Sequence, residues 1–392
     1  MSKIKKGVDM ELLAPAGDKN KLIMAFNYGA DAVYLASKKF GLRTFAGNFD
    51  LEELKWATNF AHKLGKKIYV TVNIIPHDSD LIGLDDYIKS LDEAHVDAVI
   101  VSDLGVMQIV KRVAPKLDIH ISTQANVTNS ETAKFYASLG AKRIILAREM
   151  SLEEIKNIRK ELPQEVEIEA FCHGAMCISY SGRCLLSTFM TGRDANRGAC
   201  VQACRWQYEI NEVNKKEKYP IEEDSKGTYI LNSQDMCMIK YLNQIKDAGV
   251  ASIKIEGRMK SEYYVANVVN AYRLALDYLS SHKTYRLPEK IANEVNKSSH
   301  RQYGTGFYFG EAKQNFDSSM PEASYDFVAL VKNDTEDGKT LVEMRNRFKL
   351  GEELEVLTPE HNFLAGENCD LKKAKDYASL NDTITIKAII DD

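Results

Sequence analysis

Five of the seven cysteines of this 392-residue chain lie between positions 171 and 205. Four of them follow the spacing C-x6-C-x15-C-x3-C, namely Cys177, Cys184, Cys200 and Cys204. Zinc fingers pair their cysteines in C-x2-4-C knuckles, which only the last pair approaches, and the bacterial ferredoxin spacing C-x2-C-x2-C does not fit. The spacing alone therefore leaves an iron–sulfur cluster, a zinc ion and free thiols open as explanations.

Three neighbouring residues compete for roles beside these thiols. Cys172 falls in an apolar run and is interpreted as core filling, whereas Cys237, further along the same segment, is a reserve metal ligand. His173 stands four residues before Cys177, so it would be the base of a thiol nucleophile, or else a hydrogen-bonded histidine at a strand end.

Basic and aromatic side chains are interspersed with the cysteines. The arginines are Arg183, Arg193, Arg197 and Arg205. Guanidinium groups bind phosphates and stack on bases, so we expect these four to contact RNA. The alternative is that they neutralise a bound cluster or face water. Aromatic residues that would stack on unpaired bases are Tyr180, Phe189 and Trp206.

A second group of charges comes at the end of a predicted strand. Lys254, Glu256 and Arg258 alternate along the chain, so they share one face of an extended strand. Charges on one face would be costly in a filled core, which favours a polar pocket for a small anionic molecule. An internal layer of salt bridges is the alternative. Arg148, at another strand end, is assigned to the same predicted site.

The elements that must position these residues alternate regularly. Eight apolar runs, most of them separated by helical patterns, occupy 10–17, 30–37, 66–74, 96–103, 117–125, 141–150, 165–174 and 250–258. Eight buried strands, each followed by a helical pattern or, after the seventh, by the cysteine-rich stretch, predict an α/β protein with a (β/α)8 TIM-type barrel. A doubly wound open sheet is the other possibility, although no G-x-G-x-x-G follows the first strand.

The predicted barrel domain covers residues 1–310 and includes a cysteine-rich insertion at 174–237, after strand seven. An ordinary βα loop has ~2–6 residues, and one this long is usually functional. Residues 311–324 are a predicted linker. Four short alternating runs then predict a small C-terminal all-β domain, resembling a β-barrel, at 325–392.

The overall composition is that of a soluble protein. Hydrophobic residues make up 44% and charged residues 28%, with a net charge of −4, so a polyanion would need a local basic patch. The sequence shows neither a signal peptide nor an apolar run long enough for a membrane span, which favours the cytoplasm. Clustered cysteines in that reducing compartment are more typical of ligands than of disulfides.

Three stretches together resemble peptidase family U-32, the collagenase-like peptidases. They are 10–49, 171–208 and 252–273, and the similarity is greatest to the branch implicated in tRNA hydroxylation. The resemblance implies a (β/α)8 barrel with a [4Fe–4S] cluster on four cysteines. Its motifs place these ligands at Cys177 in HGAMC, Cys184 in SGRC, and Cys200 and Cys204 in GACVQAC. Cys237 remains possible as the fourth ligand.

The resemblance also implies an activity. Members of the tRNA branch are implicated in making 5-hydroxyuridine at the wobble position, with prephenate as co-substrate and without oxygen. We therefore expect a cytoplasmic tRNA uridine 5-hydroxylase. Its predicted catalytic residues are Lys254, Glu256, Arg258, Arg148 and His173. The alternatives are a collagenase-like peptidase and an RNA-binding scaffold with a structural zinc.

Overall fold

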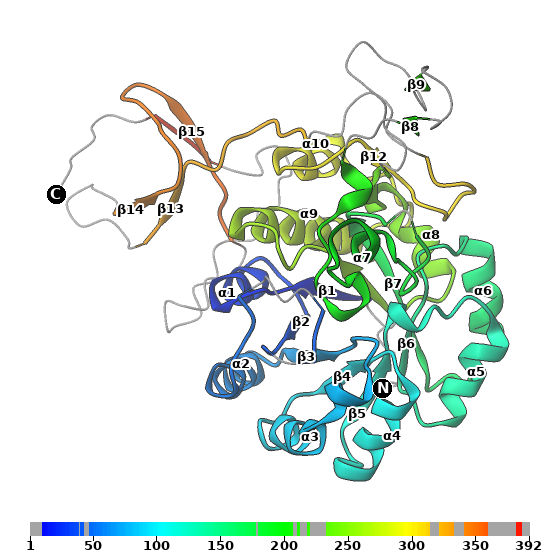
Figure 1. Cartoon of the computed structure of the whole chain (residues 1–392). Helices are drawn as coiled ribbons and strands as arrows, with labels where there is room; N and C mark the ends of the chain where they lie inside the picture. The colour runs from blue at the N-terminus through cyan, green and yellow to red at the C-terminus, as the bar shows by residue number, and fades with distance from the viewer. Residues whose placement is uncertain are drawn as a thin grey trace, which may run out of the picture.

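The computed structural model describes residues 10–38, 40–42, 47–177, 179–206, 210–211, 218–219, 233–313, 321–332, 341–359 and 382–385. Within these ranges the chain forms a closed barrel of parallel strands surrounded by helices (Figure 1). The strands are β1 (Glu11–Pro15), β2 (Ala32–Ala36), β3 (Lys67–Val72), β4 (Ala98–Val101), β5 (Asp118–Ile121), β6 (Arg143–Ile145), β7 (Glu167–Gly174) and β11 (Ser252–Ile255).

Closure of the barrel comes from the last strand. β11 pairs in parallel with both β1 and β7, so the order β1 to β7 is completed into a ring. All eight predicted strands are present, and the (β/α)8 prediction is confirmed. The strands are buried on both faces, as in β2, where every residue is buried. This explains why they appear in the sequence as continuous apolar runs.

Helices connect the barrel strands and cover their outer face. They are α1 (Lys19–Asn27), α2 (Leu51–Lys63), α3 (Leu84–Glu93), α4 (Leu104–Val113), α5 (Ser130–Ser138), α6 (Leu152–Glu161), α8 (Leu242–Asp247) and α9 (Glu262–Ser281). Short polar side chains begin many of them. Asp50 and Ser151 each form a capping box with the glutamate three residues later, and the Ser261 hydroxyl accepts from the Tyr264 amide at the start of α9.

The connection between β7 and α8 is the enlarged one, as predicted. It contains α7 (Leu186–Thr191), the 3-10 helices η3 (Ala195–Arg197) and η4 (Ala203–Arg205), and the strands β8 (Ile210–Asn211), β9 (Lys218–Tyr219) and β10 (Asp235–Cys237). β10 turns back antiparallel to the end of β7 and pairs on its other side with β12 (Tyr303–Gly304).

Gly174 allows this change of direction at the end of β7. Its φ is +110°, and an added Cβ would lie 2.6 Å from the Glu256 carbonyl oxygen. Only glycine combines that backbone conformation with so close an approach.

Short strands follow the barrel, and each of the four runs predicted for the C-terminal region contains one. They are β13 (Ala329–Val331), β14 (Val342–Met344), β15 (Glu353–Val356) and β16 (Asp382–Thr385), arranged as two antiparallel pairs. The predicted closure into a barrel-like shape involves segments outside the described residues, and the domain boundaries remain predictions. No helix among the described residues is both long and apolar enough to cross a membrane.

Contacts with α9, α10 (Glu289–Glu294) and the segment after it place these strands beside the barrel (Figure 1). The rings of Tyr263 and Phe327 stack 5.3 Å apart. Lys297 forms ion pairs with Glu294 and Glu355, which joins the end of α10 to β15.

Candidate active site at the barrel mouth

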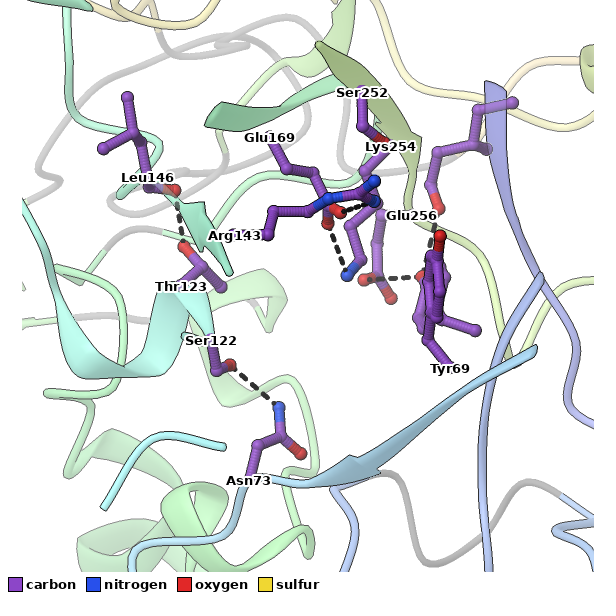
Figure 2. A network of polar contacts seen from close by, with 12 residues as sticks. Tyr69, Asn73, Ser122, Thr123, Arg143, Leu146, Glu169, Ser252, Lys254 and Glu256 are labelled. Atoms are coloured by element: carbon purple, nitrogen blue, oxygen red, sulfur yellow. Dashed lines mark hydrogen bonds and ion pairs between the residues drawn. The ribbon is translucent and has the colours of Figure 1, made fainter. Parts of the chain in front are cut away.

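The interior of the barrel contains a layer of charges near the N-terminal ends of its strands. Arg143, the first residue of β6, bonds to Glu11 at 2.6 Å, to Glu167 at 2.6 Å and to Glu169 at 3.1 Å. Lys254 lies 2.9 Å from the other oxygen of Glu169. Figure 2 shows the Arg143 and Lys254 side chains converging on Glu169 from β6 and β11.

Neutral hydrogen-bonding groups complete this layer. Glu11 accepts from the Tyr69 hydroxyl at 2.8 Å and from the Ser252 hydroxyl at 2.9 Å. Burial would raise the pKa of Glu11, yet this pKa is lowered because Arg143 stabilises the carboxylate. The pKa of Arg143 is correspondingly raised by Glu11 and Glu169 against the effect of burial. The charges are therefore paired and satisfied, as buried charges must be.

This layer fits the second of the two interpretations of Lys254. The ammonium group is buried, is paired with Glu169 and lies 4.2 Å from the centre of the Tyr34 ring. Lys254 therefore belongs to an internal salt-bridge layer. Although it alternates with Glu256 and Arg258 along the chain, it does not share their environment.

Glu256 and Arg258 come after β11, at the C-terminal end of the barrel. Arg258 is buried and donates to the Thr71 hydroxyl at 3.4 Å and to the Leu42 carbonyl oxygen, so it reaches across the mouth towards β3. Glu256 is part-buried, with the Tyr34 hydroxyl 3.5 Å from its carboxylate. These two residues, unlike Lys254, lie at the barrel end where active sites of this fold are found.

The cysteine loop, defined here as residues 175–206, is anchored over that same mouth. Arg148, which follows β6, donates to the Ala175 carbonyl oxygen at 2.9 Å and hydrogen-bonds the Cys177 side chain. Burial opposes the charge on Arg148, but its pKa is raised because Cys177 and Glu256 lie nearby. The predicted proximity of Arg148 to the strand-end site is therefore present.

Further along, the loop is fixed again to the connection after β6 and to two other connections. Ser181 bonds to Glu149, and Gly182 packs so tightly that an added Cβ would lie 2.2 Å from the Gln124 carbonyl oxygen. Asn196 accepts through its carbonyl oxygen from the Ile75 amide at 3.0 Å. Contacts from the loops after β3, β5 and β6 thus hold the insertion against the barrel.

All four predicted ligand cysteines are on this loop and at least partly accessible. Cys177 is exposed, and the other three are half-buried. The Gln202 amide donates to the Cys200 sulfur at 3.3 Å, a contact that favours a thiolate. Within the described ranges, no three His, Cys, Asp or Glu side chains come close enough together to hold a metal ion. The chemistry of the donors fits a thiolate-bound metal or cluster.

The other two cysteines among the described residues lie in strands and not on the cysteine loop. Cys172 is fully buried in β7, as predicted, and burial raises the pKa of its thiol well above the usual value. Cys237 lies in β10 directly opposite His173, and burial raises the pKa of its thiol to about 11. Cys237 is half-buried, as Cys204 is, and the choice between the two as fourth ligand stays a prediction.

His173 occupies a core position. Its Nδ1 is 3.4 Å from the Tyr272 hydroxyl and its Nε2 is 3.4 Å from the Tyr303 hydroxyl. Burial lowers the pKa of His173 to about 3, with smaller contributions from His300 and Lys260, so the imidazole stays neutral. Both ring nitrogens face tyrosines, which is the geometry of the hydrogen-bonded histidine and not that of a base paired with Cys177.

The loop presents arginines and apolar side chains to the outside. Arg183, Arg193 and Arg197 are exposed, and Arg197 is paired with Asp80 at 2.5 Å. The side chain of Arg205 lies outside the described residues. The exposed large apolar residues of the loop are Tyr180, Leu185, Phe189, Met190 and Trp206. Phe189 is 82% exposed, although α7 packs against η3 and η4 through its other face.

A small pocket opens beside Cys177. Its volume is about 50 Å³, and its lining includes Met176, Gln234, Phe307 and Lys313. It lies where the start of the loop meets the segments around β10 and β12. Cys177 is one of the residues that line this pocket.

Three residues of this site were not singled out as functional in the sequence. Glu169 and Arg143 lie in apolar strands, and Ser181 is a small residue in the loop. The signal for the first two was a charge inside a buried run, which predicts a buried partner but not which one. Nothing in the sequence indicated that Ser181 would bind Glu149.

Comparison with known proteins agrees with this architecture. The sequence pattern of peptidase family U32 matches residues 17–318, and that of the family's C-terminal domain matches residues 323–376. The "tRNA hydroxylation protein P1" of Bacillus subtilis is 40% identical over 355 residues, covering 89% of this chain and 84% of that protein. The "tRNA hydroxylation protein P" of Escherichia coli is 37% identical over 396 residues, covering 90% of this chain and 87% of that protein.

A relative with a different name also matches. The "Collagenase" of Porphyromonas gingivalis is 32% identical over 319 residues, which is 77% of this chain and 74% of the collagenase. Because the family pattern spans most of the sequence and relatives above 30% identity span the barrel, this chain belongs to peptidase family U32.

Proposed function

We propose that this chain is an RNA-modifying enzyme of the cytoplasm that converts the wobble uridine of tRNA to 5-hydroxyuridine. The observation that carries the proposal is the cysteine loop, which is anchored over the barrel mouth and presents exposed arginines and aromatic rings. Two relatives named for tRNA hydroxylation, each matching about nine-tenths of the chain, support this choice among the chemistries of the family.

The surface of the loop supports a nucleic acid as the substrate. The whole chain has a net charge of −4, so binding of a polyanion must be local. Arg183 and Arg193 are exposed, and Asp194, the acidic residue beside them, uses its side chain to accept from the Asn196 amide. Exposed rings such as Phe189 suit unpaired bases, which are available in the anticodon loop and absent from a regular duplex.

We also propose that Cys177, Cys184, Cys200 and Cys204 bind a [4Fe–4S] cluster. Such a cluster would supply electron transfer when bound, with one thiolate on each iron. The chain's own contribution is to favour thiolates: the Gln202 amide donates to Cys200, and the Arg148 guanidinium lies against Cys177. Hydrogen bonds and positive charge at the sulfurs are the usual means of tuning such ligands.

The net chemistry requires another reactant. Replacing C5–H of uracil by C5–OH adds one oxygen atom to the base and removes two electrons from it. In a reaction without O2, both requirements fall on other reactants, and we propose prephenate as the co-substrate. Its two carboxylates suit guanidinium groups, and Arg258 lies at the barrel mouth.

Nucleoside mass spectrometry of tRNA tests the substrate. A strain that lacks this gene and any redundant hydroxylase should contain no 5-hydroxyuridine, and the wild-type chain should restore it. Unchanged 5-hydroxyuridine in that strain would reject the substrate. Growth with and without prephenate synthesis, under anaerobic conditions, tests the co-substrate, because the modification should depend on prephenate and not on oxygen.

Metal analysis after anaerobic purification separates the proposal from its alternatives. About four iron atoms per chain would support the cluster. One zinc and no iron would favour the RNA-binding scaffold. A collagenase activity would need a base for the thiol, and the geometry of His173 between Tyr272 and Tyr303 gives no support to that role.

A further inference from the structure

Two adjacent residues of opposite charge follow β6, and each contacts the short segment that carries Cys177. Arg148 donates to the Ala175 carbonyl oxygen at 2.9 Å and hydrogen-bonds the Cys177 side chain. Glu149 accepts from the Ser181 amide at 2.9 Å and lies 3.2 Å from the Ser181 hydroxyl. One dipeptide therefore contacts this segment on both sides of the cysteine.

The residues around this dipeptide are held by hydrogen bonds and ring packing within the barrel. The Leu146 carbonyl oxygen accepts from the Thr123 hydroxyl at 3.0 Å, and the Ala147 amide donates to the Val127 carbonyl oxygen at 3.1 Å. The Arg148 guanidinium carbon lies 5.3 Å from the centre of the Phe171 ring in β7. Because strands and packed rings hold these residues, their side chains can fix a loop that has little regular structure of its own.

The rest of the cysteine loop is attached elsewhere. Asn196 accepts from the Ile75 amide, and Arg197 pairs with Asp80, both in the connection after β3. Ser187 in α7 holds the Val201 amide. The segment with Cys177 and the segment with Cys200 are therefore anchored independently, so each can be loosened without the other.

We propose that Arg148 and Glu149 are positioning residues: together they fix the Cys177 sulfur at the barrel mouth, and Arg148 keeps a permanent positive charge beside it. Arginine is suited to this task because its planar group can hold a carbonyl oxygen and a sulfur at once and stays charged when buried. Glu149 prevents the far end of the segment from moving away. The part of the inference that concerns a bound cluster rests on the proposed function.

Hydrogen–deuterium exchange of the metal-free, full-length protein tests the positioning. In Arg148→Gln and in Glu149→Gln, amides of residues 175–181 should exchange at least tenfold faster, whereas the peptide covering α7 should be unchanged. Arg273→Gln is the control, because Arg273 is also a part-buried arginine but lies on α9, where it pairs with Asp31 and Asp277. Equal protection of these amides in the wild type, in Arg148→Gln and in Glu149→Gln would overturn the proposal.

The charge is tested separately on the iron-loaded protein. In Arg148→Gln the midpoint potential should shift to more negative values and the electron paramagnetic resonance spectrum should change, because a nearby cation stabilises the reduced, more negative cluster. Arg148→Lys keeps the charge and should retain most of the wild-type potential. A purely structural arginine would give equal potentials in all three proteins, and that result would overturn the assigned role.

The two proposals fail in different ways. If the wild-type protein binds no iron, but amides 175–181 lose protection in Arg148→Gln and in Glu149→Gln, the positioning role is supported and the cluster is rejected. A protein that binds iron and makes 5-hydroxyuridine, yet keeps full protection in the variants, would reject the positioning role alone.

Discussion

Arg143 lies inside the barrel with three carboxylates around it, whereas Arg183 and Arg193 project into water from the loop over the opposite end. At the N-terminal end each charge is paired, so the layer contributes to the integrity of the barrel. At the mouth, the arginines contact backbone carbonyls or a single acidic partner, and several of them are exposed. Ends of a (β/α)8 barrel divide in this way between stability and chemistry.

The same contrast holds for the cysteines. Cys172 is enclosed by β7 and contacts the Lys254 carbonyl oxygen at 3.5 Å, whereas Cys177 is exposed five residues later. Neighbouring thiols thus have different chemistry because the strand ends between them. Burial keeps the first protonated, and the loop gives the second an arginine and access to solvent.

The largest effect should come from exchanging one loop cysteine. We expect Cys200→Ser to reduce 5-hydroxyuridine in a complemented strain to the level of the deletion, because one ligand of the proposed cluster is lost. Cys172→Ala is the matched control and should retain the modification. The comparison would be broken if Cys172→Ala abolished the modification and Cys200→Ser did not.

A smaller but still large effect is expected at the other end of the barrel. Glu169→Leu removes the buried partner of Lys254, and we expect the free energy of unfolding to fall by about 3–5 kcal/mol. Urea unfolding followed by circular dichroism measures this. Adding Lys254→Met should recover part of the loss, since the unpaired charge is then gone. A double variant as unstable as the single one would show that the pair is not the cause.

Truncating an exposed ring should separate binding from stability. Phe189→Ala should weaken the binding of an anticodon stem-loop RNA by about 1–3 kcal/mol, which is the usual contribution of a ring stacked on a base. Unfolding should change by less than about 0.5 kcal/mol, because the ring is exposed. Fluorescence anisotropy against a duplex of equal length measures the difference, and equal weakening for both RNAs would argue against stacking on unpaired bases.

The smallest effect should appear only in acid. The pKa of Glu11 is lowered from its usual value of 4.5, so its ion pair stabilises the fold fully above about pH 4.5 and is lost as the pH falls through the lower, folded-state pKa. The midpoint temperature of thermal unfolding should therefore fall between pH 7 and pH 3, and it should fall less steeply in Glu11→Gln than in the wild type. Parallel pH profiles of the two proteins would show that Glu11 does not contribute to the pH dependence of stability.

Much of the barrel could be predicted because its strands are short apolar runs with helical patterns between them. The position of the insertion could be predicted too, because a long cysteine-rich segment interrupts the alternation of strand and helix patterns. The separate roles of Lys254, Glu256 and Arg258 could not be predicted. Their alternation shows that they share a face of the chain, but not that they share an environment.

What the sequence determined by itself was the repeating β/α order and the supply of thiols and arginines in one loop. These follow from local periodicity and composition, which each segment carries independently. Tertiary structure alone decided that Lys254 would be neutralised by Glu169, that His173 would be enclosed by tyrosines, and that Arg148 would lie against Cys177. Such contacts join residues 29 to 130 positions apart, and only the pairing and packing of the barrel strands bring them together.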